Sequence, residues 1–440
     1  VTNTGNLHFN VDSIGTDGAI TYNANGTSTL YQYWAKNVGL NGIISGQGTV
    51  NVIAEHGDGG GDHRFILRNT GNTFNGVYNL ASTNKSTIEL AISDTATGGV
   101  AKTASFTLGH ANATLAISAS EVTIAGLAGT AGNVQSEGAG VHTLTINQAL
   151  DTEFSGIIGE ATGGGTMGIV KDGVGLLTLS GANTYTGPTT INSGTLKANH
   201  VTALGAGNVT INGGTLDATN KHLGNKITIQ GGKVSNFAKS GAGTLKEVSL
   251  LATNKDTNKT ITIDKSFLQA TTADSVKIGL GNQLIMMGGS TVTLGSAGQS
   301  NVATIALGQI NLTNGANQAA MTVTSGDTLT LAGTWTLDLS GFNPSENQDY
   351  VFQLISLADS GTYADWVKDK LDLTYFTGFT ITGNDGFTVD NNTVKASLKN
   401  DGTVTLTYSG GPTPVVPEPS TVSLTLLALT GLLLRRRRAN

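Results

Sequence analysis

The clearest pattern in the chain is a short alternation of apolar and polar positions that occurs three times in its middle. Three segments align without gaps: Ile191-Asn-Ser-Gly-Thr-Leu-Lys-Ala198, Ile211-Asn-Gly-Gly-Thr-Leu-Asp-Ala218 and Ile229-Gln-Gly-Gly-Lys-Val-Ser-Asn236. They start 20 and 18 residues apart. Each has an apolar residue, a glycine-bearing turn and a second apolar residue, which is typical of two short β-strands joined by a tight bend.

Self-similarity at this period predicts a stacked architecture, because one unit is too small to bury its own apolar face. We expect Ile191 and Leu196 to face a shared interior, with Gly194 letting the chain bend between them. A period near 20 suits one coil of a solenoid. We therefore predict an all-β fold, a right-handed parallel β-helix (β-solenoid), over residues 1–333.

Composition agrees with this fold class and excludes several functions. Only 12% of the 440 residues are charged and 61 are glycine, whereas a typical soluble domain has about 25% charged residues. The absence of cysteine excludes disulfide scaffolds, cysteine zinc sites and a thiol nucleophile. The net charge is −6, and it is −10 up to Leu434, before the final arginines. This acidic balance argues against nucleic acid as a partner.

One segment resembles a known family. Lys171-Asp-Gly-Val-Gly-Leu-Leu-Thr-Leu-Ser-Gly-Ala-Asn-Thr-Tyr-Thr-Gly-Pro-Thr-Thr-Ile-Asn-Ser-Gly-Thr-Leu196 is similar to the autotransporter-associated β-strand repeat, and the best copy extends over 171–218. Diverged copies follow the same pattern at 65–76 and 151–156. The resemblance implies a parallel β-helix passenger on a cell surface. The residues that carry the motif are Gly181, Asn183, Tyr185, Gly187, Gly194 and Leu196.

The character of the sequence changes after residue 333. Aromatic residues become frequent in 334–409, and Thr362-Tyr-Ala-Asp365 predicts the start of a short helix ending at Lys370. Val394 to Lys399 and Thr403 to Tyr408 alternate around Asn400-Asp401-Gly402, which predicts a β-hairpin. We interpret 334–409 as a small β-rich cap that covers the strand edges at the end of the solenoid.

The last 31 residues predict a linker and a membrane segment. Residues 410–419 form a proline-rich linker, and 420–434 are uncharged and mostly apolar. As a helix this apolar segment is ~22 Å long, shorter than the ~30 Å hydrocarbon core. The basic tail Arg435, Arg436, Arg437 and Arg438 is expected to stay cytoplasmic and act as a membrane stop.

Residues 410–440 resemble the PEP-CTERM sorting signal of Gram-negative bacteria. That resemblance implies processing at Pro417, Glu418 and Pro419 by an exosortase-type enzyme. It implies a protein that is secreted or displayed outside the inner membrane, after transient or permanent anchoring by the C-terminal helix.

The best candidate for chemistry is the polar run Glu55-His56-Gly57-Asp58-Gly-Gly-Gly-Asp62-His63-Arg64. Carboxylates and basic residues in such a run can bind Ca²⁺ or move protons, so Asp58 and Asp62 are weak metal candidates. Nothing elsewhere in the sequence completes a site, and we favour a solvated loop. No catalytic residue, metal site or cofactor is assigned.

The sequence leaves two functions open. The favoured one is a non-catalytic structural or adhesive surface protein, whose outward Thr, Asn and Ser side chains contact extracellular polysaccharide or surface matrix. The alternative is a β-helix carbohydrate-active enzyme or glycan-binding module. That alternative would depend on Asp58, Asp62, His63 and Arg64.

Overall fold

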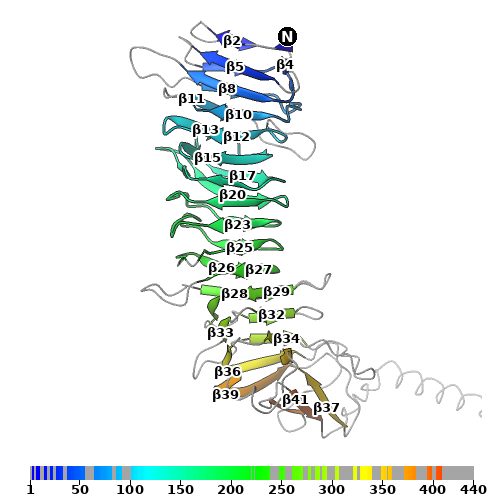
Figure 1. The fold of residues 1–440 in the computed structure, drawn as a ribbon. Coiled ribbons are helices and arrows are strands. Elements are labelled where there is room, and N and C mark those ends of the chain that lie inside the picture. The colour runs from blue at the N-terminus through cyan, green and yellow to red at the C-terminus, as the bar shows by residue number, and fades with distance from the viewer. Residues whose placement is uncertain are drawn as a thin grey trace, which may run out of the picture.

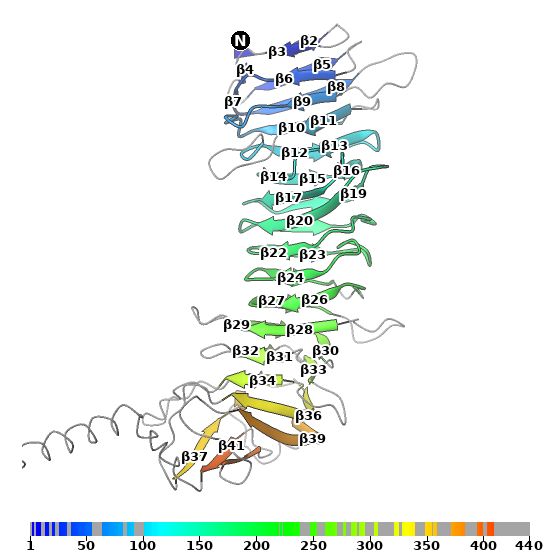
Figure 2. The ribbon, with the colours of Figure 1, turned by 180° about the vertical axis from the view of Figure 1, so that it is seen from behind.

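The structure is a computed structural model, and its strands stack into one elongated solenoid (Figure 1). The same stack is seen from behind in Figure 2. The structure describes residues 2–3, 6–9, 14–16, 20–22, 26–32, 37–54, 64–81, 86–91, 101–219, 221, 223–237, 247–252, 260–270, 276–278, 283–287, 290–294, 303–306, 321–324, 328–338, 348–353, 355–358, 371–382, 394–398 and 403–408.

Three long sheets form the walls of the solenoid, and every strand pair within them is parallel. Sheet I has 15 strands among the described residues and runs along the whole stack. In spatial order they are β2 (Asn6–Phe9), β5 (Thr27–Gln32), β8 (Thr49–Ala54), β10 (Val77–Leu80), β12 (Ser105–Leu108), β15 (Gly126–Gly129), β18 (Thr152–Phe154), β21 (Leu176–Leu179), β23 (Thr195–Ala198), β25 (Thr215–Asp217), β27 (Gly232–Ser235), β29 (Thr260–Asp264), β32 (Gln283–Met287), β35 (Met321–Thr324) and β38 (Ile355–Ala358).

Sheets II and III form the other walls. Sheet II is confined to the N-terminal part of the stack and consists of β3 (Ile14–Thr16), β6 (Asn37–Leu40), β9 (Arg64–Leu67), β11 (Ser86–Leu90), β13 (Ala113–Ile117), β16 (Asn133–Ser136) and β19 (Ile157–Glu160). Sheet III begins further along the chain and consists of β14 (Glu121–Ile124), β17 (Val141–Asn147), β20 (Thr166–Asp172), β22 (Thr189–Ile191), β24 (Val209–Ile211), β26 (Lys226–Ile229), β28 (Glu247–Ala252), β31 (Val276–Ile278), β34 (Ala303–Ala306), β36 (Thr328–Asp338), β33 (Thr291–Leu294) and β30 (Phe267–Ala270), with β39 (Leu371–Thr382) paired to β36. A short sheet of β1 (Thr2–Asn3), β4 (Ile20–Tyr22) and β7 (Ile44–Gly46) lies at the N-terminal end.

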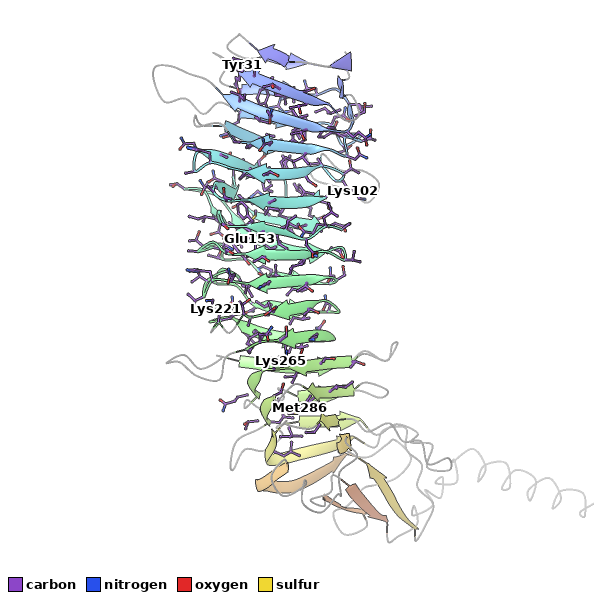
Figure 3. All side chains as sticks on the ribbon, viewed as in Figure 1. Tyr31, Lys102, Glu153, Lys221, Lys265 and Met286 are labelled. Atoms are coloured by element: carbon purple, nitrogen blue, oxygen red, sulfur yellow. The ribbon has the colours of Figure 1, made fainter. Side chains whose placement is uncertain are left out.

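The predicted stacking of the three aligned segments is confirmed residue by residue. Ile191 pairs with Ile211, which pairs with Ile229 in sheet III. Leu196 pairs with Leu216 in sheet I, and Leu216 pairs in turn with Val234 on the next strand of that sheet. All of these side chains are buried. Alternation along each strand therefore sends one set of side chains into the space between the sheets and the other set outward (Figure 3).

Coil length differs from the predicted period outside the middle of the chain. Tyr78 pairs with Phe106 and Val234 with Ile263, so these coils contain 28 and 29 residues. In the N-terminal coils the chain includes a strand of sheet II between successive strands of sheet I. Buried aromatic rings pack together in these N-terminal coils: the ring centroids of Phe74 and Tyr78 are 4.9 Å apart, and those of Tyr78 and Phe106 are 5.3 Å apart.

The predicted C-terminal hairpin is confirmed. β40 (Val394–Leu398) pairs antiparallel with β41 (Thr403–Tyr408), and β37 (Gln348–Gln353) pairs with the other side of β41. The predicted helix over 362–370 and the whole of 410–440 lie outside the described residues. In the described part of the chain, no helix has the length and apolar character needed to cross a membrane.

Candidate functional site

The repeat motif predicted as 171–196 builds the corner of a coil rather than an open cleft. Sheet II ends at β19, and the loop after β21 crosses the free edge of β19. Asn183 Oδ1 accepts a hydrogen bond from the amide of Ile158 at 2.8 Å, and the Asn183 Nδ2 donates to the carbonyl oxygen of Ala203 at 2.6 Å. The Thr184 amide donates to the carbonyl oxygen of Ile158 at 2.9 Å. One buried asparagine thus joins two coils through their main chains.

The other motif residues serve the same packing. Tyr185 is fully buried and its hydroxyl lies 2.7 Å from Thr189 Oγ1; burial raises the pKa of Tyr185. Gly181 and Gly187 lie where an added Cβ would overlap a carbonyl oxygen of the preceding coil. Gly194 has a φ of +63° in the turn between sheets III and I, and Leu196 is buried in the core. The predicted motif residues are therefore brought together for stacking.

The diverged copy at 65–76 uses its asparagine in the same way. Asn72 Oδ1 accepts a hydrogen bond from the Ile44 amide at 2.8 Å, as Asn183 does from Ile158. The place in the coil differs, because Asn72 precedes a strand of sheet I whereas Asn183 precedes a strand of sheet III. In the fragment at 151–156, Phe154 lies inside β18.

Two further stacking residues were not predicted from the sequence. Asn225 is buried, and its Nδ2 donates to the carbonyl oxygens of Gly205 at 3.1 Å and Gly207 at 2.8 Å. Glu160 Oε1 accepts hydrogen bonds from the amides of Met167 at 3.0 Å and Thr186 at 2.9 Å. Although burial opposes the charged form, these donors lower the pKa of Glu160. Neither residue lies in a recognisable motif.

Lys171 is a buried cation within a column of isoleucines. It pairs with Ile146 on one side and Ile191 on the other, and its side chain is 0% exposed. Its Nζ donates to the carbonyl oxygens of Asp172 at 2.7 Å and Gly173 at 2.9 Å. Burial lowers the pKa of Lys171 to about 8, against the opposing effect of nearby carboxylates.

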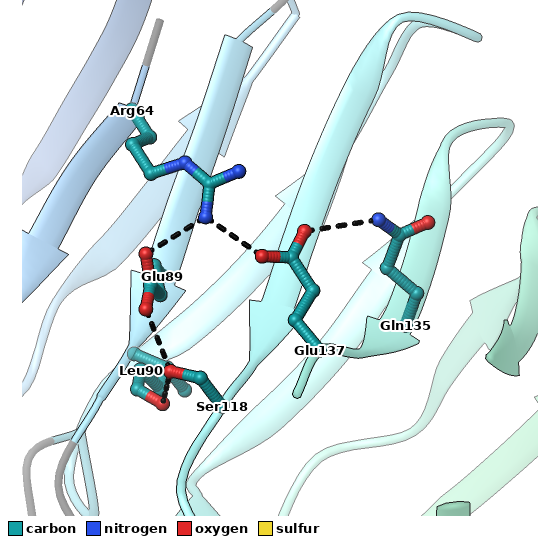
Figure 4. A network of polar contacts seen from close by, with 6 residues as sticks. All are labelled: Arg64, Glu89, Leu90, Ser118, Gln135 and Glu137. Atoms are coloured by element: carbon teal, nitrogen blue, oxygen red, sulfur yellow. Dashed lines mark hydrogen bonds and ion pairs between the residues drawn. The ribbon is translucent and has the colours of Figure 1, made fainter. Parts of the chain in front are cut away.

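Most of the predicted chemical run, including Asp58, Asp62 and His63, lies outside the described residues, but Arg64 is described at the start of β9. Arg64 joins two glutamates from later coils (Figure 4). Its Nη1 lies 2.8 Å from Glu89 Oε2 and 2.7 Å from Glu137 Oε2, and all three side chains are 15–20% exposed. Burial opposes the charge of Arg64, but the two carboxylates raise its pKa.

Each of the four carboxylate oxygens in this cluster accepts a hydrogen bond from the protein. Ser118 Oγ donates to Glu89 Oε1 at 2.7 Å, and Gln135 Nε2 donates to Glu137 Oε1 at 3.1 Å. A general acid must hold a proton and a nucleophile must point at substrate. Here both carboxylates are ion-paired with the Arg64 guanidinium and each accepts one further hydrogen bond. This arrangement is typical of a structural ion pair that links different coils. Among the described residues, no group of three or more His, Cys, Asp or Glu side chains is arranged to hold a metal ion.

Comparison with known proteins agrees with the repeat. Residues 169–198 match the family described as Passenger-associated-transport-repeat. The chain is also 32% identical over 137 residues to the Adhesin BmaC autotransporter of Brucella suis biovar 1 (strain 1330). That match covers 29% of this chain and spans only 4% of the relative. The resemblance to autotransporter-associated repeats is confirmed for this part of the chain. The predicted sorting residues, Pro417 to Pro419 and Arg435 to Arg438, lie outside the described residues.

Proposed function

We propose that this chain is a non-catalytic β-solenoid displayed outside the cell, where it acts as a structural or adhesive surface protein. The observation that carries the proposal is that the positions of the repeat motif serve packing between coils. Its asparagine, tyrosine and glycines are buried in contacts between coils, so the repeat extends a rod and presents outward rows of polar side chains. Similarity to an adhesin of the autotransporter type supports the same role.

Adhesion is tested with beads coated with the purified full chain. We expect the beads to attach to extracellular matrix from the producing organism, and beads coated with a soluble globular protein to remain unattached. Equal attachment of both bead types would refute the adhesive role.

The alternative is a β-helix carbohydrate-active enzyme or glycan-binding module. It is tested by replacing Asp58, Asp62 and His63 with alanine and measuring release of reducing sugars from matrix polysaccharide. We expect no release from either the parent or the variant chain. Release by the parent chain that is lost in the variant would establish the enzyme instead.

The finer features belong to the same proposal. The coils wind in a right-handed sense, as β-strand crossovers do, and residues 334–409 cap the stack.

The C-terminal tail directs sorting. An exosortase-type enzyme recognises Pro417 to Pro419, while Arg435 to Arg438 stay cytoplasmic. Mass spectrometry of the C-terminus in surface and membrane fractions tests this. We expect surface chains ending near Pro419, and chains ending at Asn440 in the membrane fraction alone would refute cleavage.

A further inference from the structure

The outward face of sheet III has a regular column of threonines. Register pairs Thr123 with Thr145, then continues through Val170 to Thr190, Thr210 and Thr228, one residue per coil. All six side chains are partly exposed. Each of the six is followed by a buried residue of the interior column. Because successive side chains of a strand point to opposite faces of the sheet, the threonine column points outward. Valine has nearly the same shape as threonine and does not break the surface.

A second polar column runs beside the first. Its members lie two positions further along each strand and are Asn147, Asp172, Asn192, Asn212 and Gln230. Asn212 Nδ2 donates to Asn192 Oδ1 at 3.0 Å, so these two amides bond along the stack. One oxygen of the Asp172 carboxylate is bonded within its corner, where Oδ1 accepts from Ser193 Oγ at 2.6 Å and from the Gly173 amide at 2.9 Å.

The equivalent face of sheet I is different, although it belongs to the same coils. Its outward column contains Lys197 and Asp217, and Lys233 forms an ion pair with Asp264 at 2.6 Å. On sheet I charges lie within the outward columns, whereas the threonine column of sheet III carries hydroxyl and methyl groups. Outward charges on sheet III lie beside that column, at Glu121, Asp172 and Lys226. The two faces offer different partners to the surroundings.

We propose that the outward face of sheet III binds an extended, uncharged polysaccharide, with about one sugar residue per coil. The inference rests on the proposed adhesive function and names its ligand class. Hydroxyls and amides both donate and accept hydrogen bonds, as sugar hydroxyls do. Strands repeat every ~4.8 Å, and a β-1,4-linked pyranose chain advances by a similar distance per sugar. An uncharged column in an acidic protein gives no attraction to a polyanion.

The test uses the full chain in native gels that contain hydroxyethylcellulose, a soluble neutral β-1,4-glucan, with alginate gels as the polyanionic comparison. We expect the parent protein to be retarded in hydroxyethylcellulose and not in alginate. Replacing Thr190 and Thr210 together with lysine places bulk and charge on sheet III. We expect this variant to bind at least about tenfold more weakly, because several hydrogen bonds to the chain are lost.

The matched control replaces Thr195 and Thr215 with lysine. This pair lies on sheet I in the same two coils, is equally paired in register and is also partly exposed. We expect its binding to stay within about twofold of the parent. Circular dichroism and thermal melting check that both variants fold. If the lysine pair on sheet III unfolds the chain, Thr190→Val with Thr210→Val keeps the shape and removes the hydroxyls, and about tenfold weaker binding is again expected.

Equal loss in the sheet I and sheet III variants would overturn the assignment to sheet III. Failure of the parent chain to bind hydroxyethylcellulose, while coated beads still attach to matrix, would overturn the ligand class and leave adhesion intact. Retardation in alginate alone would overturn the uncharged ligand. Failure of the beads to attach is the separate result that removes the adhesive function itself.

Discussion

The buried cation Lys171 allows a prediction whose sign and size follow from its surroundings. The change is Lys171→Met, which keeps an unbranched side chain of similar length and removes the charge. Methionine fits an apolar column between Ile146 and Ile191 without a large change in volume. Replacing a buried charged group by an apolar one of similar size is often neutral or stabilising.

The magnitude comes from the pKa. Lys171 has a folded-state pKa of about 8 against an ordinary value of 10.5, with burial as the main cause. At 1.36 kcal/mol per pH unit, the charged form costs the folded state about 3 kcal/mol. Because the folded pKa lies below the unfolded one, the unfolded chain binds more protons between pH 8 and 10.5. The free energy of unfolding of the parent chain therefore rises with pH through this window.

The assay is chemical denaturation of both proteins, followed by circular dichroism, at pH 7 and about pH 10.5. At pH 7 we expect the variant to equal the parent or to exceed it by about 1–3 kcal/mol. Between the two pH values the parent should gain about 3 kcal/mol relative to the variant. Ionisation of tyrosines in the unfolded chain affects both proteins equally and cancels in the comparison.

The matched control is Ile191→Met, one coil further along the same column. It should cost less than about 1.5 kcal/mol, and this cost relative to the parent should be the same at pH 7 and pH 10.5, because the variant keeps Lys171. A Lys171→Met variant that is strongly destabilised by the same amount at both pH values would refute the reasoning. The hydrogen bonds from Nζ to the carbonyl oxygens would then outweigh the cost of burying the charge.

Three further predictions concern single corners of the coils. Asn183→Leu should lower the free energy of unfolding by about 3 kcal/mol, because a buried amide and a buried carbonyl oxygen each lose a partner; a loss below about 1 kcal/mol in denaturation would contradict this. Gly194→Ala should cost about 2 kcal/mol, since φ is +63° and the new Cβ would lie 2.6 Å from the Gly175 carbonyl oxygen. Gly213→Ala, in the next corner, meets nothing closer than 3.0 Å and should cost less; equal melting of the two variants would contradict the argument. Glu160 has a lowered pKa, so its stabilisation is present above its ordinary pKa of 4.5 and is lost as pH falls through the folded value. Glu160→Gln should therefore flatten the decline in melting temperature on acidification, and an unchanged decline would show that Glu160 does not contribute.

The middle of the solenoid was predictable because the nearly constant spacing of the repeat fixes which residues pair in successive coils. Ile191, Ile211 and Ile229 fall at one position of a nearly constant period, so their stacking follows from the alignment. The alternation of period 2 then assigns Thr190 and Thr210 to the outside. Sheet II was not predicted, because its strands lie in coils of unequal length and no period connects Leu40 with Leu67 and Leu90.

The charged cluster needed the coordinates for a different reason. Arg64 and Glu137 are 73 residues apart, and their contact depends on the length of every corner between them. A change of one residue in a strand would turn a side chain to the opposite face of the sheet. From the sequence, Arg64 belonged to a run with Asp58, Asp62 and His63, whereas the described structure pairs it with two glutamates of other coils.

What the sequence determined by itself was the local pattern: short strands, glycine turns, an apolar interior and a repeat of about 20 residues. These follow from steric preference and from the need to bury apolar side chains, which act within a few residues. Only the tertiary structure decided which residues meet between coils. Lys171 illustrates the difference, since no neighbouring residue in the sequence predicts that its side chain is buried. Two of the carbonyl oxygens that hold its amine belong to the next two residues, but the third, of Ser193, lies in the next coil and reaches the amine only when the corner has closed.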